Sequence, residues 1–177
     1  MMNKYLILLF LFPVLLLAQQ NEMEDLWQHY DYFAGKWQGH ETGKAGIGQG
    51  SREYRFIMNR TYLYQENTSR FEPQEKNPKG ETHSDHAYFS YDQGRQTFIL
   101  REFNSEGYVN YYALDSTMSD SQKLVFVSEK SENAPPTLKA RLTLEIKNRD
   151  EFIETFELSF KDNNYNEWLK NYWTRLK

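Results

Sequence analysis

The most regular pattern in the chain is a strict alternation of apolar and polar residues between positions 137 and 147. A period of two is that of a strand with one buried face and one face in water. Weaker alternation of the same kind predicts nine further strands, at residues 36–42, 52–58, 61–71, 83–91, 96–104, 108–114, 123–130, 151–161 and 165–175.

The connections between these strands are short and hold no helical crossover. Parallel neighbours would need crossovers of a dozen or more residues, so the strands are predicted to be antiparallel and up-and-down. Closure removes exposed edges, which favours a barrel over an open sheet. We therefore predict an all-β fold, a ten-stranded antiparallel up-and-down β-barrel. The glycine-rich residues 43–50 are predicted to form a mobile loop.

A helical stripe precedes the first strand. Leu26, Trp27, Tyr30 and Phe33 recur at the spacing of one helix face, and the pattern ends at Gly35. This short N-terminal helix is predicted to cap the closed end of the barrel, and the alternative is a gate over its mouth. Gly35 would allow a sharp turn into the first strand.

Trp37 follows directly, in the pattern Gly35-Lys36-Trp37. Its ring is predicted to plug one end of the barrel. Arg175, at the end of the last predicted strand, is placed to stack on the indole face. We assign Gly35, Trp37 and Arg175 structural roles.

Residues 1–18 read as a signal peptide: an apolar run from 5 to 17 follows a lysine and ends at Ala18. The run is shorter than the ~20 residues of a membrane-spanning helix, so no stable span is expected after cleavage. An uncleaved anchor is the alternative. Residues 19–177 are predicted to form a single domain, exported to the periplasm or the extracellular space, as a monomer or homodimer.

Composition narrows the choice further. Thirteen tyrosines, 12 phenylalanines and 4 tryptophans favour β structure. The chain has no cysteine, which excludes disulfides. Its net charge of −4 argues against nucleic acid or an anionic membrane as a partner.

Several strands mix aromatic and polar residues on both faces, which predicts a partly polar interior cavity instead of a solid apolar core. Parity alone does not decide which face is inward, and carboxylates at 66, 102 and 157 share this ambiguity. In the alternative, the tyrosines lie on the exterior under long Lys and Arg side chains. The residues predicted to line the cavity and bind a ligand are Tyr54, Tyr62, Tyr64, Glu66, Tyr88 and Arg101.

No catalytic residue or metal site is predicted. The four histidines lie at 29, 40, 83 and 86, so none is available to complete a triad built in the second half of the chain. On a strand, His83 and Asp85 share one face and His86 faces the other way, so these three side chains do not converge on one ion. His83 and Asp85 could offer two metal ligands, with His40 or Glu41 completing a site. A hydrogen-bonded or exposed histidine beside a carboxylate is the simpler interpretation.

The order of these motifs resembles lipocalin-like (calycin) barrels, and within them the nitrobindin-like and fatty-acid-binding-protein-like branch. Trp37-Gln38-Gly39 is similar to its W-x-G, and His83-Ser84-Asp85-His86-Ala87 looks like its H-x-E-x-G. The resemblance implies a ten-stranded barrel with an interior ligand pocket. Nitrobindins hold haem through a late-strand histidine, and residues 152–177 contain none, so no cofactor is predicted.

We predict a protein that binds a small hydrophobic or amphipathic molecule in an aromatic, partly polar cavity. Two alternatives stay open. One is a cavity-based isomerase or cyclase with Glu66 or Glu157 as base and Arg101 stabilising charge. The other is an envelope interaction protein with a vestigial cavity. A binding protein is favoured over an enzyme.

Overall fold

A computed structural model describes residues 26–161 and 164–177 of the chain. It divides into two compact units, with the boundary between Phe33 and Ala34. The described part contains one short helix, residues 26–31, and ten strands. The strands are β1 (Gly35–Gly43), β2 (Gly46–Ile57), β3 (Tyr62–Phe71), β4 (Glu81–Asp92), β5 (Thr97–Asn104), β6 (Val109–Leu114), β7 (Lys123–Glu132), β8 (Lys139–Asn148), β9 (Glu151–Ser159) and β10 (Asn166–Arg175).

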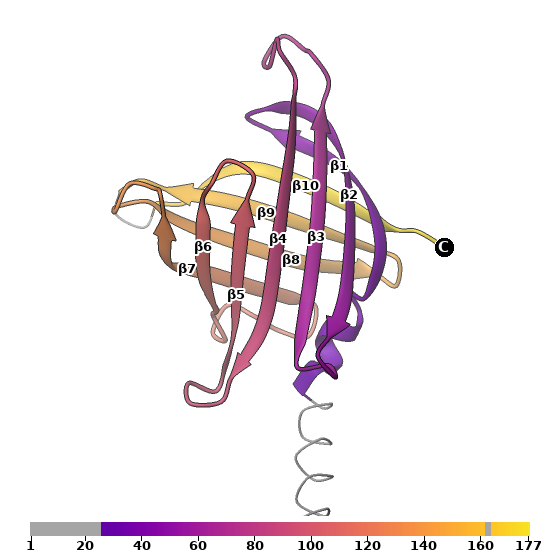
Figure 1. Ribbon diagram of the computed structural model, residues 1–177, viewed down its shortest axis with the longest axis vertical. Helices are drawn as coiled ribbons and strands as arrows, with labels where there is room; N and C mark the ends of the chain where they lie inside the picture. Colours follow the sequence, from indigo (N-terminus) through magenta and orange to yellow (C-terminus); the bar gives the residue numbers. More distant parts are fainter. Residues whose placement is uncertain (1–25, 162–163) are drawn as a thin grey trace, which may run out of the picture. The chain divides into compact units, whose positions relative to one another are not determined.

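The ten strands form one closed barrel in which each strand pairs antiparallel with its sequence neighbours (Figure 1). β1 and β10 close the ring, with Trp37 opposite Arg175 at one end and Gly43 opposite Leu169 at the other. The predicted all-β, ten-stranded, up-and-down barrel with one short N-terminal helix is therefore confirmed.

The glycine-rich segment corrects a prediction. Residues 46–50 belong to β2 and are not a mobile loop, so the connection to β1 is only Lys44 and Ala45. The reason is packing: a Cβ on Gly48 would lie 2.6 Å from the ring of Phe71, and one on Gly50 would lie 2.6 Å from the ring of Trp173. Because these two glycines have no side chains, the two aromatic rings can lie directly against the backbone of the strand.

The up-and-down order gives the barrel two distinct ends. The connection between β4 and β5, together with the start of β1 and the finish of β10, marks the terminal end. The connections that follow β1, β3, β5, β7 and β9 mark the distal end. In Figure 1 the long β3–β4 connection identifies the distal end and the β4–β5 connection the terminal end.

The inner face at the terminal end is packed with apolar side chains. Trp37 meets the ring of Phe152 edge to face at 4.7 Å, and Phe89 meets Phe126 in the same way at 5.6 Å. All four side chains are buried. Burying a ring of this size stabilises the fold by roughly 1.5–3 kcal/mol. The guanidinium carbon of Arg175 lies 4.1 Å from the Trp37 ring centroid, the contact expected from the sequence.

In the smaller unit, the helix of residues 26–31 brings Trp27 and Tyr30 into an edge-to-face contact of 5.3 Å. The helix ends where the Phe33 amide donates to the Tyr30 carbonyl at 3.0 Å. Its role as a cap stays a prediction, and the predicted signal peptide at residues 1–18 lies outside the described residues. Among those that are described, no helix has the length and apolar character needed to cross a membrane.

Candidate functional site in the barrel interior

The inner face changes character along the barrel axis. Towards the distal end, the inward positions of several strands carry polar or charged side chains that are nonetheless buried. These side chains, which we call the interior polar network, are Glu41, Arg52, Gln65, Asn67, Ser69, Asp85, Glu154 and Asn171. Buried polar groups persist only where partners satisfy them, so their contacts decide what the interior can bind.

Arg52 is the centre of this network. Both its terminal nitrogens bond to the carboxylate of Glu154, and its Nε donates to Asn67 Oδ1 at 3.1 Å. Nη1 also donates to the hydroxyl of Tyr54 at 3.1 Å. Burial acts to lower the pKa of Arg52, but the charge of Glu154 more than offsets it, and the pKa lies well above its usual value. Arg52 is therefore held as a cation, and its bidentate contact with Glu154 is an ion pair.

Asp85 is the next carboxylate in the network. It accepts hydrogen bonds from Gln65 Nε2 at 2.9 Å and Asn67 Nδ2 at 2.8 Å. His83 Nε2 lies 3.3 Å from its Oδ2. Burial opposes ionisation, but the contacts with His83 and Arg52 outweigh it and lower the pKa of Asp85. Asp85 is therefore held as a carboxylate.

His83 bridges two acids. Its other ring nitrogen lies 2.8 Å from Glu106 Oε1. The bonds to Asp85 and Glu106 raise the pKa of His83 to about 9, against the effect of burial. This is the hydrogen-bonded histidine of the simpler sequence interpretation. Across residues 26–161 and 164–177, no three side chains of metal-ligand type gather where an ion could be held.

Glu102 differs from the other interior carboxylates. It pairs with Ala87 of β4 on one side and Asn110 of β6 on the other, so it lies within the sheet and on the inner face. It nevertheless keeps intermediate exposure. The other inward carboxylates, Glu41, Asp85 and Glu154, are all buried, so Glu102 is the least withdrawn from solvent of the four.

The hydrogen bonds of Glu102 are long and neutral. Asn110 Nδ2 and the Tyr112 hydroxyl both donate to its Oε2, each at 3.3 Å. Burial and the charge of Asp85 raise the pKa of Glu102 to about 7. A carboxyl with a pKa in this range changes charge near neutral pH.

An apolar wall faces this polar side. Phe156 and Leu158 continue the inward positions of Phe152 and Glu154 on β9, and Leu169 lies opposite Phe156 on β10. All three of these distal residues keep intermediate exposure, whereas Phe152 is fully buried. In the distal half of the interior, carboxylate and amide groups therefore lie on one side and apolar side chains on another.

The structure separates the predicted lining residues. Tyr54 is buried on the inner face beside Arg52. The other five lie on the outer face, because the residues that alternate with them along the strands, among them Leu63, Phe89 and Leu100, are the ones buried inside. The prediction that these five residues line the interior is therefore wrong, and their role in binding stays untested. They are Tyr62, Tyr64, Glu66, Tyr88 and Arg101.

On the outer face, these side chains form an aromatic strip. The hydroxyl of Tyr64 is hydrogen bonded to His86 Nδ1, and the rings of Tyr64 and Tyr88 lie 5.1 Å apart. Arg55 covers the Tyr64 ring at 4.6 Å. This is the arrangement of the exterior alternative, in which tyrosines on the outer face lie under long cationic side chains.

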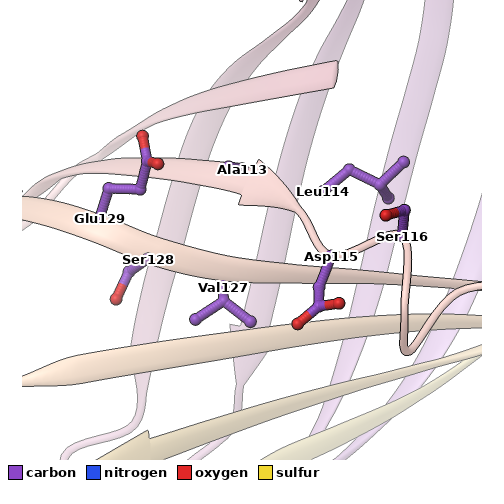
Figure 2. Close-up of a pocket in the computed structure, with 7 residues that line it drawn as sticks. All are labelled: Ala113, Leu114, Asp115, Ser116, Val127, Ser128 and Glu129. Carbon is purple, nitrogen blue, oxygen red and sulfur yellow. The ribbon is translucent and has the colours of Figure 1, made fainter. Parts of the chain in front are cut away.

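A surface pocket of about 350 Å³ lies where β6 ends and β7 runs past it (Figure 2). Its two carboxylates already have partners: Asp115 accepts three hydrogen bonds from Thr117 and Met118, and Glu129 pairs with Arg95. Both acidic residues of the pocket are therefore already engaged by neighbouring groups of the chain. Its lining residues are Ala113, Leu114, Asp115, Ser116, Val127, Ser128 and Glu129.

Comparison with known proteins supports the fold. No family model matches the chain, and no curated protein matches its sequence. The crystal structure of Rv2717c from M. tuberculosis is similar, with a TM-score of 0.57 and 12% identity over 85% of this chain and 97% of that one. A de novo designed fluorescence-activating β-barrel has a TM-score of 0.39 and 10% identity over 82% and 95% of the two chains. The likeness to Rv2717c supports the fold, a closed antiparallel β-barrel.

Proposed function

We propose that this protein is an exported barrel that binds a small amphipathic molecule in the distal half of its interior. The observation that carries the proposal is the partial exposure of inward-facing residues on two walls of different polarity, Glu102 on β5 and Phe156 with Leu158 on β9. Ligand sites combine an apolar surface with a few placed polar groups, and these walls supply both. Export rests on the signal-peptide pattern of residues 1–18.

Native mass spectrometry of the protein from its own host, before and after denaturation, tests this proposal. A bound mass lost on denaturation is expected. The variant Leu158→Trp would fill the distal interior and should carry no such mass, whereas Thr155→Trp, at an outward position of β9, should keep it. Detection of bare protein alone, with no additional bound mass, for the wild type and both variants would contradict the proposal.

An enzyme using the same interior is the second candidate, and Glu102 is the observation that favours it. A general base works best with a pKa near the operating pH, and the pKa of Glu102 is about 7. The bases suggested by the sequence are placed differently: Glu66 is exposed on the outer face, and Glu157 pairs with Arg141 at 2.6 Å. Turnover of a bound molecule that Glu102→Gln abolishes, with binding retained, would identify this activity.

A further inference from the structure

The charges facing the interior are out of balance. Four carboxylates, Glu41, Asp85, Glu102 and Glu154, face inward, and the described cations beside them are Arg52 and, near the distal end, His83. The guanidinium of Arg175 lies at the terminal end, over Trp37 and beside Asp150. Arg52 is neutralised by Glu154, and His83 lies between Asp85 and Glu106. Both interior cations are therefore already paired.

The two remaining carboxyls differ in what they contact. Ser69 Oγ donates to Glu41 Oε1 at 2.5 Å, and burial raises the pKa of Glu41, so this group is held towards its neutral form. Glu102 receives its two long hydrogen bonds on Oε2 alone. Its Oε1 accepts none from the described residues, and no described cation pairs with it. Glu102 is also the less buried of the two.

An independent observation on the opposite wall points to the same chemistry. β10 lies five places from β5 in the ring of ten strands. Asn171 of β10 and Glu102 of β5 are therefore on opposite walls of the interior. Asn171 is 3% exposed, and its Nδ2 donates to Glu154 Oε1 at 3.0 Å. Its Oδ1 is a buried acceptor that no described donor satisfies. A buried acceptor without a hydrogen bond costs about 1–3 kcal/mol of stability.

We infer that the interior selects a cationic amphiphile, an organic ammonium with N–H donors on an apolar body, whose charge lies at Glu102 and whose body lies along Phe156 and Leu158. This inference rests on the proposed function. An ammonium donates and never accepts, which suits Glu102 Oε1 and, for a ligand that reaches across, Asn171 Oδ1. A carboxylate ligand would be repelled by Glu102 and Asp85. A cation beside Glu102 would also lower the pKa of that carboxyl. Trp173 Nε1, two residues along from Asn171, is a buried donor without a described acceptor, so a ligand reaching that depth would present an acceptor there.

The test is calorimetric titration with three probes of one chain length, octylammonium, octanol and octanoate, at about pH 8, where Glu102 is ionised. We expect octylammonium to bind at least tenfold more tightly than octanol, and octanoate to bind most weakly. Glu102→Gln should weaken octylammonium about tenfold and leave octanol unchanged. Glu167→Gln, at an exposed position of β10, is the matched control and should change neither.

The outcomes separate the inference from the function on which it rests. Octanoate binding as tightly as octylammonium, or an unchanged octylammonium affinity in Glu102→Gln, would overturn the cationic ligand while leaving an interior binding site. Failure of all three probes would remove support from both. If Glu102→Gln does not fold, the affinity of the wild type for octylammonium, measured as a function of pH, tests the cationic ligand instead. Asp85, Glu154, Arg52, Tyr112 and Asn110 surround Glu102, and octylammonium affinity should rise through about pH 7 while octanol affinity stays level.

Discussion

Arg52 of β2 and Glu154 of β9 form a bidentate ion pair inside the barrel, although three steps of the sheet separate their strands. Their side chains are 4% and 7% exposed, so the pair is removed from water. Two buried charges stabilise each other only while both are present. The pair therefore joins two parts of the wall that do not touch through the sheet.

Removing one partner of this ion pair should lower the free energy of unfolding much more than removing both partners. Glu154→Leu leaves the guanidinium buried and unpaired, with an expected loss of about 3–5 kcal/mol in the free energy of unfolding. The double variant Arg52→Met/Glu154→Leu should recover most of that loss. Urea denaturation measures all three. Glu129→Gln, in the exposed Arg95–Glu129 pair, serves as the control and should be indistinguishable from wild type. Additive losses in the double variant would contradict this account.

Arg175 should contribute to stability through three contacts at the terminal end. It stacks over Trp37 at 4.1 Å, donates to the Ala34 carbonyl at 2.8 Å and lies 3.6 Å from Asp150. Arg175→Ala should lower the free energy of unfolding by about 1–3 kcal/mol, the sum of a stacked cation and a hydrogen bond. The free energy of unfolding of Arg175→Lys should lie between those of Arg175→Ala and wild type. Substitution of the exposed Lys177 by alanine should leave it unchanged. Equal midpoints for Arg175→Ala and wild type would count against the stacking role.

Glu102 should make the barrel less stable as pH rises towards neutrality. The unfolded carboxyl ionises near 4.5, and burial and the charge of Asp85 raise the folded pKa to about 7. The folded protein therefore holds the extra proton between these values. The stabilisation is complete below about pH 4.5 and is lost as pH rises through 7.

Glu102→Gln mimics the protonated form and should remove this dependence. Relative to wild type, the variant should gain on the order of 2 kcal/mol between pH 4.5 and 7, because raising a pKa by one is worth about 1.4 kcal/mol and solvent partly screens this carboxyl. Urea denaturation at several pH values measures the difference. Glu66→Gln should run parallel to wild type. A constant offset between wild type and Glu102→Gln across the whole range would show that Glu102 titrates normally.

The sequence predicts the architecture well because each strand carries a local signal. The alternation around Leu142 and Leu144, the short connections and the Gly35-Lys36-Trp37 start are all readable without tertiary information. The glycine-rich segment is the exception. Its composition indicates flexibility, but Gly48 and Gly50 are strand positions on which the rings of Phe71 and Trp173 rest. Those contacts come from β3 and β10, and the local sequence of β2 does not reveal them.

The interior site is harder to predict, because strand parity fixes which residues share a face and not which face is inside. Tyr64, Tyr88 and Arg101 do share a face, and it is the outer one. Arg52 and Glu154 are not among the residues predicted for the site. The signal was present, since Glu154 shares parity with Phe152 and Phe156, and Arg52 shares parity with Tyr54. A lone charge among aromatic positions was the clue to a buried ion pair between distant strands.

The wall around Trp173 should not tolerate a side chain at Gly39. These residues are paired between β1 and β10, and a Cβ on Gly39 would lie 2.7 Å from the Trp173 ring. The ring has little room to move, because Phe152 stacks on it at 6.1 Å and Arg52 covers it at 4.3 Å. Gly39→Ala should therefore lower the free energy of unfolding by about 1–3 kcal/mol, the usual cost of overpacking.

Gly94→Ala is the matched control for this substitution. The nearest atom to its added Cβ is Asp92 Oδ1 at 3.4 Å, an ordinary contact, and Gly94 does not have a positive φ. Its urea midpoint should stay close to that of wild type. Tryptophan fluorescence in native buffer should shift for Gly39→Ala and not for Gly94→Ala, because only the first displaces an indole. If both variants unfold at the wild-type midpoint, the ring does not fix the backbone at Gly39, and the close approach of β1 to Trp173 has a cause other than packing.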